Sequence, residues 1–182
     1  MIRQWLWPED GFKPVSRAAL IGWGIFYLLF FLNAALDDDG FLFIDFANLM
    51  IHEAGHFFFS WFGYYTQILG GTLGELLVPL LCALVFLRRG ETTAVAFCSF
   101  WFFENFLYIA TYMGDARTSA LPLVGSEESD WTILFTHWGV LIHDRTIAAW
   151  TRAIGWVGML ATVGWLAWMH VRTRDQIKKS FF

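Results

Sequence analysis

Long apolar segments separated by short polar breaks are the feature that most limits how this chain can fold. Each of the longest segments can cover the hydrocarbon core of a membrane as a helix rising about 1.5 Å per residue. These segments run over about 16–36, 41–62, 68–87, 92–113 and 146–170. A further apolar segment, 131–143, is too short to span comfortably and predicts an interfacial or re-entrant helix. The sequence therefore predicts an all-α polytopic membrane helix bundle, a single transmembrane domain over 1–182.

The composition supports a membrane protein. Apolar residues make up 57% of the 182 residues and aromatic residues 20%, whereas only 15% are charged. This apolar share is well above that of ordinary soluble domains. We expect a multi-pass protein of a bacterial-type plasma membrane, with membrane lipids as partners. The net charge of −4 is spread over loops and argues against a nucleic-acid partner.

The two cysteines do not predict a metal site or a disulfide framework. Cys82 and Cys98 each lie within an apolar run and do not form a CxxC pair. Such isolated cysteines are typical of reduced, packed side chains. Any metal site in this chain is therefore expected to use other ligands.

The segment 41–62 contains an HExxH motif, formed by His52, Glu53 and His56. On a helix, positions i and i+4 lie on one face, so both imidazoles can reach one Zn²⁺. The carboxylate of Glu53 lies beside them and can take a proton from water activated by the metal. The alternative is a pair of histidines hydrogen-bonded inside a bundle, with Glu53 pairing to one of them. Ionisable groups at membrane depth are costly and usually mark a working site, which favours the metal.

Over roughly 41–117 the chain resembles the site-2 protease family of intramembrane zinc metallopeptidases. His52 and His56 match the zinc ligands of that family, and Glu53 matches its general base. The glycine-containing segment 70–75 is similar to one on the family's next helix, although the usual Asn is absent. The resemblance implies an aspartate from a later helix as third ligand, and Asp115 is the match. The family's Asp-Gly order is reversed here, and no proline is nearby.

The third ligand has two candidates. A catalytic zinc needs three protein ligands and one open position for water. If every long segment spans, 41–62 and 92–113 run in the same direction, which brings His56 and Asp115 to one membrane face. Glu75 is the alternative, because its eighteen intervening residues after His56 resemble the spacing in soluble zinc peptidases with a glutamate ligand. In its other interpretation, Glu75 is a supporting or substrate-binding carboxylate.

Other polar residues in the apolar segments have weaker assignments. Glu104 and Asn105 are expected either to support the metal site and bind substrate or to form a polar contact between helices. His137 and His143 are six residues apart, which is not a same-face spacing, so surface positions are favoured over zinc ligation.

The motif and the resemblance together predict a membrane-embedded zinc metallopeptidase with one Zn²⁺. Its substrates would be transmembrane or membrane-associated proteins. A zinc hydrolase acting on a lipid amide would use the same residues, and a non-catalytic metal-binding protein would need a fourth ligand. The sequence leaves the oligomeric state and the membrane orientation open. With the N-terminus inside and five spans, Arg88, Arg89 and the basic C-terminal segment fall outside, contrary to the positive-inside tendency. Counting 131–143 as a sixth crossing returns the C-terminal segment to the inside but leaves Arg88 and Arg89 outside.

Overall fold

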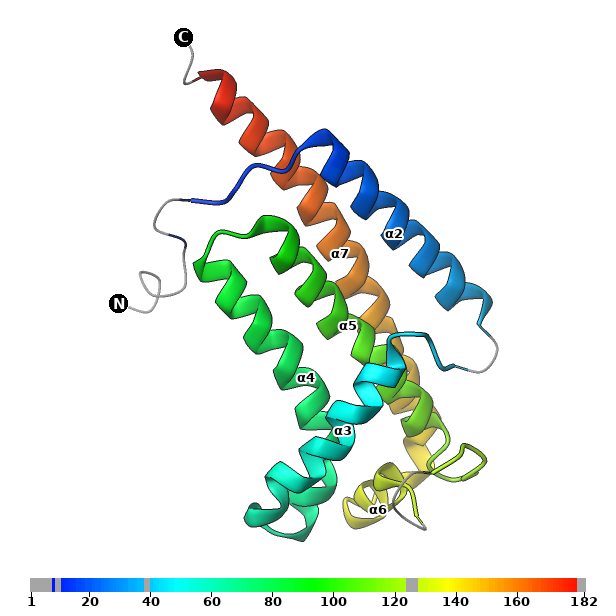
Figure 1. Cartoon of the computed structure of the whole chain (residues 1–182). Coiled ribbons are helices and arrows are strands. Elements are labelled where there is room, and N and C mark those ends of the chain that lie inside the picture. Colours follow the sequence, from blue (N-terminus) through cyan, green and yellow to red (C-terminus); the bar gives the residue numbers. More distant parts are fainter. Residues whose placement is uncertain (1–7, 9–10, 38–39, 124–127, 180–182) are drawn as a thin grey trace. The chain divides into compact units, whose positions relative to one another are not determined.

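The regular structure of the chain is helical. The computed structural model describes residues 8, 11–37, 40–123 and 128–179, with side chains up to residue 173. No strand occurs in these ranges, which confirms the predicted all-α class. Figure 1 traces the helices, which are α2 (Arg17–Leu36), α3 (Asp45–Phe59), η1 (Ser60–Phe62), α4 (Tyr64–Arg88), α5 (Thr92–Gly114), α6 (Asp130–His137), η2 (Leu141–His143) and α7 (Asp144–Lys179).

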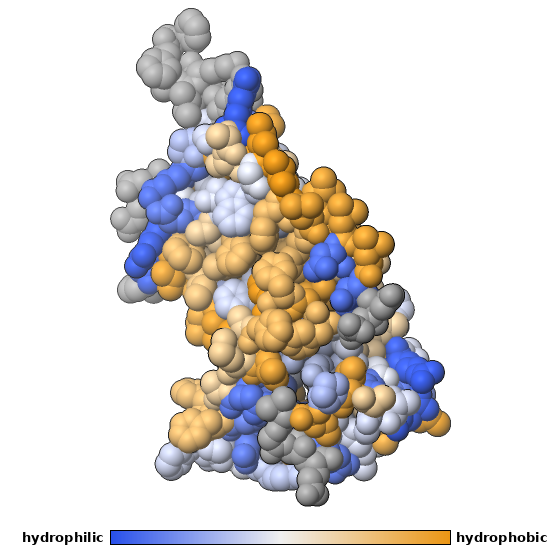
Figure 2. All heavy atoms as spheres, turned by 45° about the vertical axis from the view of Figure 1, so that its right-hand side comes forward, coloured by the Kyte–Doolittle hydropathy of each residue, from blue (hydrophilic) through white to orange (hydrophobic). Residues whose placement is uncertain are grey.

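Four helical stretches are long and apolar enough to cross a membrane. They are α2, α4, α5 and Leu141–Thr173, which joins η2 to most of α7. Large apolar side chains on α2 face outward, and Ile21, Leu28 and Leu29 are each about three-fifths exposed. Figure 2 shows apolar side chains gathered over much of the face that it draws. Exposed apolar surface of this extent is compatible with a membrane protein.

The predicted span 41–62 contains a shorter helix than expected. Helix α3 has 15 residues, so it is about 22 Å long and falls short of a hydrocarbon core of about 30 Å. The backbone N–H of Leu42 donates to the buried Asp45 carboxylate at 2.6 Å, and this turn starts the helix at Asp45. At the other end, η1 stops at Gly63, whose φ of 101° favours glycine. The predicted segment 41–62 therefore contains α3 followed by η1, and it is not among the four stretches that are long and apolar enough to cross a membrane.

The chain forms two compact units. The first comprises residues 1–38, 79–102 and 158–182, and the second comprises 39–78 and 103–157. The first unit has an aromatic core in which Tyr27 and Phe100 are buried, with ring centroids 4.6 Å apart. All the predicted site residues belong to the second unit.

The core of the second unit holds α6 in place. Three side chains of this short helix are buried: Trp131, Leu134 and Phe135. They pack in one cluster with Ile68, Ile109, Ala110, Met113, Ala116 and Ala148. Because α6 begins at Asp130, this packing fixes the position of that carboxylate.

Candidate metal centre

Helix α3 presents its two motif histidines side by side. His52 and His56 are one helical turn apart, and their ring centroids lie 4.6 Å from each other with the rings nearly perpendicular. Both side chains are half-buried. The predicted same-face arrangement is therefore present.

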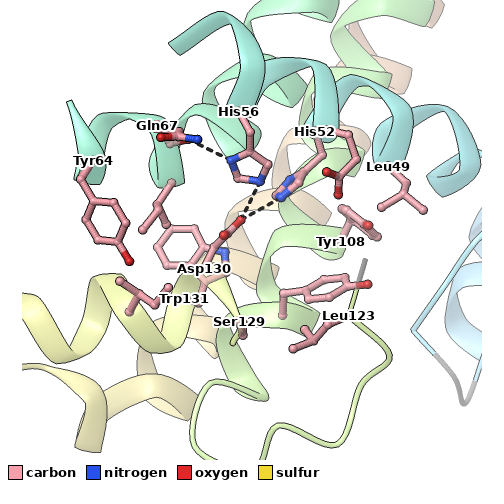
Figure 3. Close-up of a pocket in the computed structure, with 14 residues that line it drawn as sticks. Leu49, His52, His56, Tyr64, Gln67, Tyr108, Leu123, Ser129, Asp130 and Trp131 are labelled. Carbon is pink, nitrogen blue, oxygen red and sulfur yellow. Dashed lines mark hydrogen bonds and ion pairs between the residues drawn. The ribbon is translucent and has the colours of Figure 1, made fainter. Parts of the chain in front are cut away.

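Asp130 completes a cluster of three potential ligand atoms. Its Oδ2 atom lies 2.9 Å from His52 Nε2 and 3.0 Å from His56 Nε2. Figure 3 shows both contacts converging on this carboxylate. One potential metal-ligand atom from each of His52, His56 and Asp130 lies within 4.8 Å of the other two. Among the described residues, these three form the candidate metal-binding group.

The cluster fits a tetrahedral cation. With zinc bonds of about 2.0–2.1 Å, neighbouring ligand atoms of a tetrahedral site are about 3.3 Å apart. The two N···O distances in the cluster are 2.9 and 3.0 Å. Each of these two N···O distances would therefore need to lengthen by only a few tenths of an ångström for its atoms to be neighbouring ligands of one zinc ion.

The other ring nitrogen of each histidine is held by an acceptor. His52 Nδ1 lies 2.7 Å from Glu75 Oε1, and His56 Nδ1 lies 2.9 Å from the backbone oxygen of Gln67. A backbone carbonyl and an ionised carboxylate can only accept a hydrogen bond, so each Nδ1 is the donor. When such an imidazole is neutral, its Nε2 carries a lone pair, and both Nε2 atoms then point toward the place where they meet Asp130 Oδ2. Partners of this kind orient histidine ligands in metal proteins and raise their basicity.

Glycines on α3 and α4 allow the two helices to approach closely enough to make these bonds. A Cβ at Gly71 would lie 2.5 Å from the His52 ring, and a Cβ at Gly55 would lie 2.2 Å from the backbone oxygen of Gly70. Neither position can take a side chain without movement of backbone or imidazole. Small residues at these positions therefore permit the close approach of the two backbones.

Hydrogen bonding within the cluster changes its protonation. Burial disfavours the charged form of His52, but its bonds to Asp130 and Glu75 outweigh burial and raise its pKa to about 10. The bond to Asp130 also raises the pKa of His56. Burial acts to raise the pKa of Asp130, yet its bonds to both histidines lower it. Without a cation, the raised pKa of His52 thus keeps this imidazole protonated at neutral pH beside the Asp130 carboxylate.

The structure brings Asp130, not Asp115, to the histidines. The carboxylate of Asp115 accepts bonds within its own loop, from the Thr118 hydroxyl and from the backbone N–H groups of Ala120 and Leu121. Burial opposes ionisation, but these donors lower the pKa of Asp115 below its usual value. Asp115 was expected near His56 on the condition that 41–62 spans, and this segment is not among the four candidate spans. Asp130 was missed because it precedes the short apolar segment 131–143 and looks like the end of a polar loop.

Glu75 is placed to support a metal ligand, which was the second of the two roles considered for it. Its Oε1 contacts His52 Nδ1, the ring nitrogen that faces away from Asp130. Farther from the cluster, Asn48 donates to Glu104 at 3.0 Å and to Asp45 at 2.8 Å, and all three side chains are buried. Asn105 is also buried. Glu104 thus takes part in a polar contact between helices, the alternative considered for it.

The remaining predicted residues are placed as follows. Glu53 is half-buried and lines a cavity of about 310 Å³ together with the three cluster residues. His137 stacks on Tyr65 with ring centroids 3.6 Å apart. His143 is exposed, in η2. Glu53 is therefore the motif residue that remains available beside the cluster.

Comparison with protein-family models, curated proteins and solved structures found no match for this chain.

Proposed function

We propose that this chain is a membrane-embedded zinc metallopeptidase that hydrolyses peptide bonds of membrane-associated substrates. The observation that carries the proposal is the convergence of His52 Nε2, His56 Nε2 and Asp130 Oδ2 beside Glu53 in one cavity. The site-2 protease resemblance is part of the proposal, with Asp130 in the third position in place of Asp115.

Each residue has a distinct role in this proposal. His52, His56 and Asp130 would hold one Zn²⁺, which when bound activates water and polarises a carbonyl group. Glu53 accepts the proton of the attacking water and returns it to the leaving amine. Glu75 and the Gln67 carbonyl are positioning groups that keep both Nε2 atoms aimed at the metal.

The number of ligands favours catalysis over a structural metal. Structural zinc sites are closed by four protein ligands, whereas catalytic sites keep one position open. In the part of the chain that the structure describes, the cluster offers three. The four apolar helices support a substrate at or in a membrane. A lipid amide would meet the same chemistry and is distinguished by assay.

Replacing Glu53 with Gln tests the proposal. Gln keeps the size of the side chain but cannot accept a proton at neutral pH, so Glu53→Gln should retain zinc and lose at least about 100-fold in peptide cleavage. Metal analysis and a cleavage assay are made on the same detergent-purified sample, with lipid amide turnover in parallel. Glu91→Gln, the same change in the other compact unit, should alter neither quantity. Peptide cleavage by Glu53→Gln at the wild-type rate would contradict the proposal.

A further inference from the structure

The cavity beside the cluster is lined partly by polar residues and mostly by apolar or aromatic ones. The polar lining residues are those of the cluster, Glu53, Gln67 and Ser129. The remaining lining residues are Leu49, Tyr64, Ile68, Tyr108, Tyr112, Leu123, Trp131 and Ile133. Among the described residues that line it, none is Lys or Arg, and the carboxylates are Glu53 and Asp130. Away from the cluster, such walls favour an apolar side chain over an acidic one.

The size of the cavity limits what can enter it. A volume of about 310 Å³ lies at the lower end of the range of small-molecule pockets in proteins. The cavity therefore has room beside the cluster for one bulky side chain of a substrate.

Leu49 lies on the side of the cavity nearest to the proposed general base. Leu49 and Glu53 are four residues apart on α3, so they share a face one turn apart. Figure 3 places Leu49, Tyr108 and Leu123 on one side of the cluster and Tyr64 on the other. Leu49 is half-buried, with part of its surface turned to the cavity that it lines.

We propose that Leu49, Tyr108 and Leu123 form a subsite for a bulky apolar side chain of the substrate, next to the scissile bond, and that Leu49 sets its size. This inference rests on the proposed peptidase function. Removing the isobutyl group of Leu49 deepens the subsite, and a phenyl ring in its place shortens it. One or two methylene groups in such a pocket change selectivity about tenfold or more.

The test uses a mixture of peptides with all side chains represented, incubated with zinc-loaded protein in detergent, and sequences the products by mass spectrometry. Wild type should cut beside Leu, Met or Phe at one flank and discriminate against Asp and Glu there. At that flank Leu49→Ala should shift the preference toward Phe and Trp by about tenfold, and Leu49→Phe should shift it toward Ala. Met50→Ala, at the neighbouring exposed position, should keep the wild-type preference.

Unchanged preferences in both Leu49 variants would overturn the subsite, as would a wild type that accepts Asp as readily as Leu. A zinc-loaded wild type that cuts no peptide would overturn the peptidase proposal itself, and the subsite with it. The two failures are therefore distinguishable.

The positions of the basic residues carry a second, independent inference. If each of the four apolar stretches crosses the membrane once, the segments between them alternate between two faces. Of the 12 Lys and Arg residues, three then belong to the face that carries α3 and α6, namely Arg117, Arg145 and Arg152. The other nine, including Lys13, Arg88, Arg89 and Arg172, belong to the opposite face or to the helix ends beside it.

This imbalance orients the protein. Lys and Arg in short loops are retained on the cytoplasmic side during insertion. We infer that the basic face is cytoplasmic and that the metal centre, built from α3 and α6, opens on the non-cytoplasmic face. Its substrates would then be peptide segments presented outside the cytoplasm. With the N-terminus inside, Arg88 and Arg89 conflict with the positive-inside tendency only when α3 is counted as a membrane span.

Single-cysteine variants test this orientation without any assay of activity. Cys82 and Cys98 are replaced by Ala, and a membrane-impermeant maleimide is applied to intact cells. Ala120→Cys and Arg145→Cys should be labelled, whereas Lys13→Cys and Arg89→Cys should react only after permeabilisation; all four positions are exposed. Labelling of both position 13 and position 89 in intact cells would overturn the inference. Labelling of only one of these two positions in intact cells would overturn it as well.

Discussion

The two imidazoles of the cluster have different partners at their outer nitrogens. His52 donates to a buried carboxylate, and His56 donates to a backbone carbonyl. A carboxylate partner makes an imidazole a stronger electron donor than a neutral carbonyl does. We therefore expect His52 to contribute more to metal affinity than its position in the motif alone would suggest.

Replacing Glu75 with Gln tests this at the residue scale. The amide oxygen can still accept from His52 Nδ1, but the negative charge is lost, so zinc affinity should fall about 10–100-fold without being abolished. Competition with a chelator of known affinity measures this. Glu104→Gln is the matched control, because Glu104 is equally buried but accepts from Asn48. An equal loss of affinity in both variants would indicate a general effect of altering buried carboxylates.

Three residues of the candidate site could be predicted from the sequence because their relation is local. The helical repeat alone brings His52 and His56 together and puts Glu53 beside them. Asp130 is 74 residues beyond His56 and reaches it through the packing of α6 in the core. No local pattern encodes that contact. The available signal in the sequence was an acidic residue, Asp130, directly before the short segment 131–143.

At the scale of elements, the crossing of α3 and α4 depends on glycine. The backbones approach so closely that a Cβ at Gly55 would collide with the Gly70 carbonyl. A Cβ at Gly74 would lie 3.0 Å from the backbone oxygen of Ile51. The length of α3 was not predicted, because the turn made by the Asp45 carboxylate lies within a continuous apolar run.

Gly55→Ala should destabilise the protein and weaken the metal site together. The added methyl group forces α3 away from α4, an overpacking that typically costs about 1–3 kcal/mol. The melting temperature in detergent should fall, and zinc should be released at a lower chelator concentration. Gly24→Ala in α2 is the control, because its Cβ would have no atom within 4 Å, and Ala favours a helix. A Gly55→Ala protein as stable as Gly24→Ala would contradict the close crossing.

At the scale of the whole molecule, the apolar segments predicted the fold class correctly. The segments 16–36, 68–87, 92–113 and 146–170 correspond to α2, α4, α5 and α7. The ends differ most in α4, which begins at Tyr64, and in α7, which continues to Lys179. The segment 41–62 is apolar because one face of α3 carries exposed apolar side chains, such as Phe46, Met50 and Phe57. The other face carries Asp45, Asn48 and the histidines. Apolar content alone does not distinguish a membrane-spanning helix from an amphipathic one.

The zinc content of purified protein tests the central claim, that His52, His56 and Asp130 form a metal centre. Wild type, Asp130→Ala and Asp115→Ala are purified in detergent and their metal is measured per chain by mass spectrometry. We expect about one zinc in wild type and in Asp115→Ala, and close to none in Asp130→Ala, because Asp130 contacts both imidazoles and Asp115 is bonded within its own loop. Full zinc content in Asp130→Ala, or its loss in Asp115→Ala alone, would contradict it.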